Sequence, residues 1–271
     1  MIATAAEKGV ATVDGLRIAY ESVGSGDPPV VFMHGIFGNR GYFAAQAEHL
    51  SGRHRVISID LRGHGESDVP PAVSVDAFER DAVAVLEAAG TGPAVLCGHS
   101  ISGAVALDIA ARRPDLVSGV VMLDGVIFFP ELLRRGAFEG LVPALRGDQW
   151  LEALSGYMGR LIEPAPADVR ARVMKDLAGA NRDIAVSFFD SVFGSGFDGR
   201  EERNARSLAG LQCPLMYVRA ASPTDLQRLT ALKPDAMVGQ VVGSGHWPSL
   251  SATGQVNAML DRFLLEVAQR P

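Results

Sequence analysis

Short runs of consecutive apolar residues recur along the chain and alternate with longer segments in which apolar residues are three and four positions apart. Runs of this kind are typical of strands that are buried on both faces of a sheet. They cover residues 30–33, 56–59, 94–97, 119–123, 215–218 and 237–242. Helical periodicity covers residues 76–89, 101–112 and 256–268. The alternation predicts an α/β fold, with a mostly parallel, doubly wound sheet and helices on both faces.

Residues 10–23 have a different pattern, in which apolar and polar residues alternate on either side of Asp14-Gly15. An Asp-Gly pair between two such runs favours a type I′ hairpin turn. We therefore predict an antiparallel hairpin at one edge of the sheet. With its two strands, the sheet would have about eight strands.

The alternation stops between residues 126 and 211, where no segment has the pattern of a strand. Aromatic and aliphatic residues there are spaced as in helices, and arginines are frequent. Such a length is too great for a connecting loop in a compact domain. We therefore predict a helical cap insertion at 126–211, packed over one end of a core formed by residues 1–125 and 212–271.

Composition limits the classes of partner. Of the 271 residues 48% are hydrophobic and 21% are charged, and the formal net charge of -6 comes without a basic block that would favour nucleic acid. We recognise no signal peptide and no membrane-spanning run, so we expect a cytoplasmic protein that does not contact membranes. Cys97 and Cys213 lie in separate apolar segments, which favours two buried thiols over a disulfide. The expected partner is a small-molecule substrate, bound by a monomer or a homodimer.

Ser100 stands at the point where a predicted strand meets a predicted helix, in the segment Gly98-His99-Ser100-Ile101-Ser102-Gly103. A sharp strand-to-helix turn strains the serine backbone, lifts its hydroxyl out of the sheet and requires small neighbours. The N–H of Ile101 would then point at an oxygen bound next to that hydroxyl. The alternative is a serine that only caps the helix.

Four segments in the same order resemble motifs of the α/β-hydrolase fold family, and the resemblance extends over nearly the whole chain. The serine turn resembles the nucleophile elbow, with Ser102 where the usual G-x-S-x-G pattern has its second glycine. The other three are the oxyanion-loop segment His34-Gly35-Ile36-Phe37-Gly38, the D-x-R-G-x-G-x-S segment that begins at Asp60, and the histidine segment Gly245-His246-Trp247-Pro248.

The resemblance implies a role for each matching residue. Ser100 is expected to be the nucleophile, and His246 the general base that removes its proton during attack. The N–H groups of Ile36 and Ile101 are expected to form the oxyanion hole, and Gly35 to let the substrate oxygen approach the backbone. We expect no cofactor and no metal, because no His, Asp and Glu cluster has ligand spacing.

The sequence offers two candidates for the carboxylate that holds the histidine. The family usually carries this acid after the strand that matches residues 215–218, where only Asp225 lies close. Ser222 and Pro223 resemble the N-cap and the first position of a helix, which would make Asp225 an acid of the first helical turn.

Asp124 is the other candidate, because it directly follows the predicted strand at 119–123. Some members of the family carry the acid at this place, among them certain amidohydrolases and cofactor-independent dioxygenases of heteroaromatic catabolism. We therefore predict Asp124 as the acid of the triad, with Asp225 as the alternative.

A serine nucleophile predicts acyl transfer to water through an acyl-enzyme, in small-molecule catabolism. The bond would be that of a small ester, lactone or amide, or a carbon–carbon bond. The alternatives are a cofactor-independent dioxygenase, in which the histidine takes a proton from the substrate, and a ligand receptor that hydrolyses slowly.

The substrate pocket is expected beneath the insertion. The candidates to line it, besides Gly35, are the aromatic residues Phe37, Tyr42, Phe128, Phe129, Trp150 and Trp247, although each could instead be ordinary core. One arginine of the insertion could bind a substrate carboxylate, unless all of them are solvated; these are Arg134, Arg135, Arg146, Arg160, Arg170 and Arg172.

Overall fold

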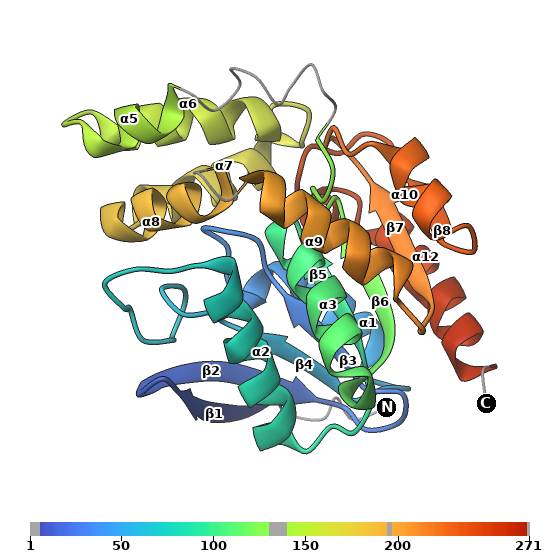
Figure 1. The fold of residues 1–271 in the computed structure, drawn as a ribbon. Coiled ribbons are helices and arrows are strands. Elements are labelled where there is room, and N and C mark those ends of the chain that lie inside the picture. Colours follow the sequence, from blue (N-terminus) through green and yellow to red (C-terminus); the bar gives the residue numbers. More distant parts are fainter. Residues whose placement is uncertain (1–5, 130–139, 194–196, 270–271) are drawn as a thin grey trace.

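The computed structural model describes residues 6–129, 140–193 and 197–269. They form one eight-stranded sheet with the strand order β1-β2-β4-β3-β5-β6-β7-β8 (Figure 1). β2 pairs antiparallel with β1 and β4, and all other neighbouring strands are parallel. The predicted fold class, a mostly parallel sheet of about eight strands, is confirmed.

The strands coincide closely with the apolar runs of the sequence. They are β1 (Glu7–Val13), β2 (Leu16–Val23), β3 (Val30–Met33), β4 (Val56–Ile59), β5 (Ala94–His99), β6 (Val117–Leu123), β7 (Leu215–Arg219) and β8 (Met237–Gln240). Every residue of β3, β4 and β5 is buried, as continuous apolar runs predict. Asp14 and Gly15 both have a positive φ, 54° and 77°, as the two central residues of a type I′ turn require.

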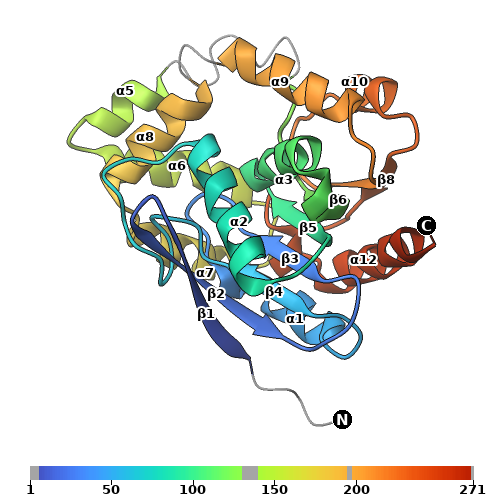
Figure 2. The ribbon, with the colours of Figure 1, turned by 60° about the horizontal axis from the view of Figure 1, so that its bottom comes forward.

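Helices cover both faces of this sheet. α2 and α3 lie on one face, whereas α1 and α12 lie side by side on the other (Figures 1 and 2). Short helical segments complete the core. The elements are η1 (Arg40–Phe43), α1 (Ala44–Leu50), α2 (Val75–Ala89), α3 (Ile101–Arg112), η2 (Pro114–Leu116), α10 (Leu226–Leu232), α11 (Pro248–Ser251) and α12 (Thr253–Ala268).

Between β6 and β7, the described residues form helices and no strand. These helices are α5 (Leu141–Arg146), α6 (Trp150–Ile162), α7 (Ala167–Ala178), α8 (Arg182–Phe193) and α9 (Phe197–Ala209), which we call the helical insert. α5 to α8 gather at one end of the sheet, and α9 runs back along α3 (Figure 1). That the insert is a separate domain with boundaries at 126 and 211 stays a prediction.

Arg203 on α9 attaches the helical insert to the core through ion pairs with three acidic residues. Its Nη1 lies 2.6 Å from the carboxylate of Asp76, and its Nε lies 2.9 Å from that of Asp108. Its Nη2 pairs with Glu79. Since Asp76 and Glu79 belong to α2 and Asp108 belongs to α3, one guanidinium joins three helices.

Two details differ from the prediction. The last strand ends at Gln240 rather than at residue 242, because the N–H of Val242 leaves the ladder and donates to the side chain of Gln255 at 3.0 Å. Both cysteines are thiols, but only Cys97 is buried, whereas Cys213 is half-buried.

Candidate active site

Ser100 stands at the carboxyl end of β5 with a strained backbone, φ 55° and ψ -124°. This conformation is rare for a residue with a side chain and is tolerated where the surroundings enforce it. A side chain at Gly98 could not be accommodated there, because its Cβ would lie 2.0 Å from the carbonyl oxygen of Ser102. At Gly103 a Cβ would lie 3.0 Å from the Cε of Met122. The small residues around Ser100 therefore let the chain turn sharply from strand to helix.

Ser102 adds a hydrogen bond that a glycine at this position could not make. Its buried hydroxyl donates to the carbonyl oxygen of His34 at 2.6 Å. The bond ties the start of α3 to the loop that follows β3. The departure from the G-x-S-x-G pattern thus fixes that loop relative to Ser100.

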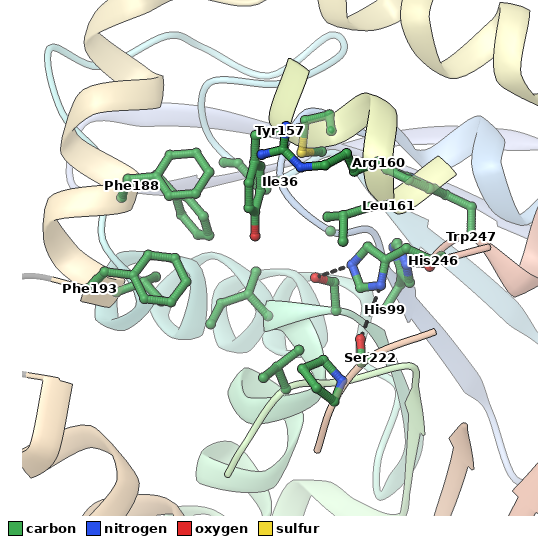
Figure 3. Close-up of a pocket in the computed structure, with 18 of the residues that line it drawn as sticks. Ile36, His99, Tyr157, Arg160, Leu161, Phe188, Phe193, Ser222, His246 and Trp247 are labelled. Atoms are coloured by element: carbon green, nitrogen blue, oxygen red, sulfur yellow. Dashed lines mark hydrogen bonds between the residues drawn. The ribbon is translucent and has the colours of Figure 1, made fainter. Parts of the chain in front are cut away.

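Ser100, His246 and Asp124 form a continuous hydrogen-bonded chain, although they are far apart in the sequence. The Oγ of Ser100 lies 2.8 Å from Nε2 of His246 (Figure 3). On the other side of the ring, Nδ1 of His246 lies 2.8 Å from Oδ2 of Asp124. Because a carboxylate accepts only, Nδ1 carries the proton and Nε2 is free to accept the proton of the serine. The imidazole is thereby held in the tautomer that a general base needs.

The carboxylate of Asp124 is fully buried and is held by the loop after β7. It accepts hydrogen bonds from the backbone N–H groups of Ala220 (2.7 Å), Ala221 (3.0 Å) and Ser222 (3.0 Å). Burial by itself raises the pKa of Asp124, but the hydrogen bond and charge of His246 and these amides outweigh it and lower the pKa to about 2. The acid is therefore ionised across the neutral range.

The chain directly after Asp124 is also held firmly. The carbonyl oxygen of Gly125 accepts hydrogen bonds from the hydroxyls of Tyr217 and Thr224, each at 2.7 Å. Ser222 donates its hydroxyl to the carbonyl oxygen of Asp124 at 2.8 Å and lies 3.2 Å from Nδ1 of His246. These bonds fix the backbone at the point where β6 leads into the insert.

The side chain of Asp225 caps the start of α10 rather than contacting His246. This residue is the N-cap of α10, and its side chain accepts from the N–H of Arg228 at 3.0 Å. The expectation that Ser222 caps this helix is wrong. The hydroxyl of Ser222 donates to the carbonyl oxygen of Asp124 instead, and the N-cap is Asp225, three residues later. The alternative in which Asp225 holds His246 is therefore not what the geometry supports.

Ile36 and Ile101, whose amides the sequence predicts for the oxyanion hole, both line the pocket together with Ser100. In the described part of the chain, no protein atom accepts a hydrogen bond from either N–H. Ile101 is the first residue of α3, where an amide has no partner within the helix and the helix dipole favours negative charge. The pair is thus available to a substrate oxygen.

Two buried histidines shape the loop that carries Ile36. His34 accepts from the N–H of Leu61 at 3.1 Å, and His64 accepts from the N–H of Phe37 at 3.0 Å. Burial lowers the pKa of His34 to about 4 and that of His64 to about 3. Both rings are therefore neutral and act as fixed hydrogen-bond partners of the loop.

His99 lies directly beneath the catalytic candidate His246. The two ring centroids are 4.8 Å apart, and Nε2 of His99 donates to the carbonyl oxygen of His246 at 2.5 Å. Burial, together with the neighbouring His246, lowers the pKa of His99 to about 3. A neutral His99 therefore supports the backbone of His246 without adding a charge.

A cavity of about 380 Å³ opens above Ser100, between the core and the helical insert. Its wall is mostly apolar and largely aromatic (Figure 3). The core contributes Gly35, Ile36, His99, Ser100, Ile101, Ser222, Pro223, His246 and Trp247. Val126 and Phe129 come from the segment after β6, and the helical insert contributes Tyr157, Met158, Arg160, Leu161, Phe188, Phe189, Val192 and Phe193. The volume suits a small organic molecule with an apolar part.

Comparison with known proteins agrees with the fold and with the arrangement of the site. The model of the family described as alpha/beta hydrolase fold matches residues 28–177, more than half of the chain. The chain belongs to the α/β-hydrolase fold family. At this level it is a hydrolase, as the sequence predicts.

Relatives of this hydrolase have different substrates in their names. It is 38% identical over 238 residues to the sn-1-specific diacylglycerol lipase ABHD11 of Mus musculus, covering 81% of this chain and 75% of the relative. It is 30% identical to the 2-(acetamidomethylene)succinate hydrolase of Mesorhizobium japonicum, with 83% of each chain covered. Among solved structures, the N-acyl homoserine lactone degrading enzyme Est816 is similar with a TM-score of 0.78 and 25% identity, over 94% of this chain and 100% of that one.

Of the residues predicted to line the substrate pocket, some line this cavity and others lie away from it. Gly35, Phe129 and Trp247 line it. Phe37, Tyr42, Phe128 and Trp150 do not. The ring of Phe37 packs against His64, and Tyr42 is buried with its hydroxyl 2.9 Å from Asp176.

Phe128 and Trp150 are likewise held away from the pocket. Phe128 is buried, with the guanidinium of Arg228 4.3 Å from its ring centroid. Trp150 begins α6 and packs, partly buried, against the hydrophobic core.

The aromatic residues Tyr157, Phe188, Phe189 and Phe193 were not predicted to line the site. Their helical spacing was the available signal, but it indicates only that they share helix faces. Ser222 was also missed, since its sequence suggested a helix cap. Of the arginines proposed to bind a carboxylate, Arg160 lines the pocket, Arg146, Arg170 and Arg172 do not, and Arg134 and Arg135 lie outside the described residues.

No group of three or more His, Cys, Asp and Glu side chains among the described residues is arranged to hold a metal ion. None of the helices that the structure describes is both long and apolar enough to cross a membrane.

Proposed function

We propose that this hydrolase cleaves a small ester, lactone or amide with an apolar acyl part, through the triad Ser100, His246 and Asp124. The observation that carries the proposal is the hydrogen-bonded chain from Asp124 through His246 to Ser100, which lies in the wall of an apolar pocket. Ile36 and Ile101 line the same pocket, and no protein atom in the described part of the chain accepts a hydrogen bond from their N–H groups. The relatives act, by their names, on a diacylglycerol, an acetamido compound and a lactone, which supports acyl transfer and leaves the substrate to be identified.

In the first step the Oγ of Ser100 attacks the acyl carbon while its proton passes to Nε2 of His246. The carbonyl oxygen becomes an oxyanion, which accepts hydrogen bonds from the N–H groups of Ile36 and Ile101. Asp124 stabilises the imidazolium that forms, because it stays ionised and bonded to Nδ1.

The intermediate then collapses, and the bond from the acyl carbon to the leaving group breaks. His246 returns the proton to the leaving alcohol or amine, and an acyl-enzyme on Ser100 remains. A water molecule, deprotonated by His246, attacks the acyl carbon in the same way. It releases the carboxylic acid and restores the hydroxyl of Ser100.

The test is turnover of p-nitrophenyl butyrate together with labelling by a fluorophosphonate, in the native protein and in Ser100→Ala. We expect labelling to be lost in the variant and kcat/KM to fall about 10⁴-fold or more. Ser51→Ala, at the end of α1 and outside the pocket, is the matched control and should behave as the native protein.

Other outcomes would point to other functions. A protein that is labelled at Ser100 but turns over only very slowly behaves as a ligand receptor. Oxygenation of a heteroaromatic substrate that persists in Ser100→Ala would favour the cofactor-independent dioxygenase, and either result contradicts the proposal.

A further inference from the structure

Arg160 projects from α6 into the roof of the pocket whose floor holds Ser100. Its side chain extends beside the ring of Tyr157, and the hydroxyl of Tyr157 points into the same cavity (Figure 3). Of the described residues that line the cavity, Arg160 is the one with a permanent charge.

The partners of the other arginines show that Arg160 is an exception within the helical insert. Each other arginine described there has a partner: Arg146 pairs with Asp190, for example, and Arg172 donates to the carbonyl oxygen of Gly41. Arg160 makes no ion pair and no hydrogen bond with any described residue. Its five N–H donors are therefore available to a ligand.

The cavity has no acidic residue in its described wall. Asp124, the carboxylate nearest to the reaction, lies behind His246 and is fully committed to that ring and to backbone amides. An anion in the cavity would therefore meet one cation, an apolar wall and no opposing charge. An isolated guanidinium in such surroundings matches a single planar carboxylate, which it can bind through two parallel hydrogen bonds.

Tyr157, on the same helix as Arg160, points its hydroxyl into the cavity (Figure 3). Burial raises the pKa of Tyr157 to about 12, so the hydroxyl stays protonated at neutral pH and adds no negative charge to the cavity. Ester and carboxylate would then be bound at opposite sides of the cavity, the ester at Ser100 and the carboxylate at the roof.

We propose that Arg160 binds a carboxylate of the substrate, so that the natural substrate is a monoester, lactone or amide whose apolar part carries a second, free carboxyl group. The proposal rests on the proposed function for the identity of the reacting bond, but the binding of the carboxylate does not require turnover.

The first experiment compares two esters of equal chain length, mono-p-nitrophenyl adipate and p-nitrophenyl hexanoate, in the native protein, Arg160→Gln and Arg160→Lys. We expect Arg160→Gln to lower kcat/KM for the adipate ester by roughly 10- to 100-fold and to change it for the hexanoate ester by less than about twofold. Arg160→Lys should recover part of the loss, because it restores the charge but not the two parallel bonds.

The matched control is Arg206→Gln, an exposed arginine of α9 outside the cavity, which should leave both rates unchanged. Equal effects of Arg160→Gln on the two esters, or no effect on either, would overturn the proposal.

A second experiment measures binding without turnover, so that failure of the proposed function can be told apart from failure of this inference. The inactive Ser100→Ala protein is titrated calorimetrically with 4-phenylbutyrate and with the neutral 4-phenylbutyramide. We expect the acid to bind at least about tenfold more tightly and to lose this advantage when Arg160→Gln is added. Equal affinity of the acid and the amide for Ser100→Ala would contradict the carboxylate site, whatever the esters show.

Discussion

Asp124 and Asp225 differ in their backbone surroundings, and this difference decides which of them can hold a histidine. The loop after β7 presents three N–H groups to the carboxylate of Asp124, whereas Asp225 uses its side chain to begin α10. The position after β7 that usually carries the acid has thus become the support of an acid from the neighbouring strand β6. The sequence could offer both residues, but the direction of the loop amides depends on tertiary structure.

The two aspartates can be told apart by their asparagine variants. In Asp124→Asn an amide replaces the acceptor of the Nδ1 proton, so His246 is no longer held in the tautomer that accepts from Ser100. We expect kcat for p-nitrophenyl butyrate to fall by about 10³- to 10⁴-fold. Asp225→Asn should change kcat by less than about twofold, since asparagine is an equally good N-cap. The reverse order of effects would assign the acid to Asp225.

At the scale of the elements, continuous burial explains why the strands could be predicted well. The residues of β3 and β4 are apolar or small on both faces, so the apolar runs at 30–33 and 56–59 coincide with the strands. The last strand was predicted too long because Val241 and Val242 continue the apolar run, although the N–H of Val242 no longer bonds to the neighbouring strand. Ser222 was misread as a cap because its local sequence suits one, and only the fold brings it to Asp124.

Arg203 links α9 to α2 and α3, so the stability of their packing depends on this one side chain. It neutralises Glu79 and Asp108, which are both buried between α2, α3 and α9. Arg203→Ala should lower the free energy of unfolding by about 3 kcal/mol at pH 8, because it leaves buried carboxylates without their main cation. Urea unfolding of Arg206→Ala, an exposed arginine of the same helix, should show a change within about 0.5 kcal/mol.

The loss caused by Arg203→Ala should depend on pH. Burial, with the charge of Asp108, raises the pKa of Glu79 to about 7 although Arg203 and Arg112 lower it, and removal of Arg203 raises it further. A carboxyl group whose pKa is higher in the folded state takes up protons on folding, so its stability penalty is small at low pH and grows as pH rises through that pKa. Urea unfolding should therefore show a smaller loss at pH 5.5 than at pH 8. The same loss at both pH values would contradict this account.

At the scale of the whole molecule, the pocket exists only because the helical insert closes over the sheet. Phe128 and Phe129 show why its lining could not be predicted: they are adjacent in the sequence, yet Phe129 lines the cavity and Phe128 packs beneath Arg228. The aromatic residues of α6 and α8 that line the cavity could not be predicted from the sequence either. Spacing predicts which residues share a helix face, but the packing of helices decides whether that face meets core or cavity.

Phe193 provides a test of the pocket as a whole, since it is half-buried at the end of α8 and stacks on Phe189 at 5.8 Å. Phe193→Ala should enlarge the cavity and raise the ratio of kcat/KM for p-nitrophenyl octanoate to that for the acetate by about tenfold. Leu265→Ala, on the exposed side of α12, is the control and should leave the ratio unchanged. A ratio that stays the same in Phe193→Ala would contradict this, and would mean that the longer acyl chain does not bind beside Phe193.

The hydroxyls of Tyr217 and Thr224 hold the carbonyl of Gly125 at the point where the chain passes from the proposed triad to the helical insert. Ser100 and Asp124 precede this residue, and from Val126 onward the chain leads into the helical insert, whose residues line the roof of the cavity. Gly125 is therefore a natural joint for protein engineering. Insert helices taken from a relative could be spliced in after it, to give hybrid enzymes that exchange one range of substrates for another while the reaction centre is inherited intact.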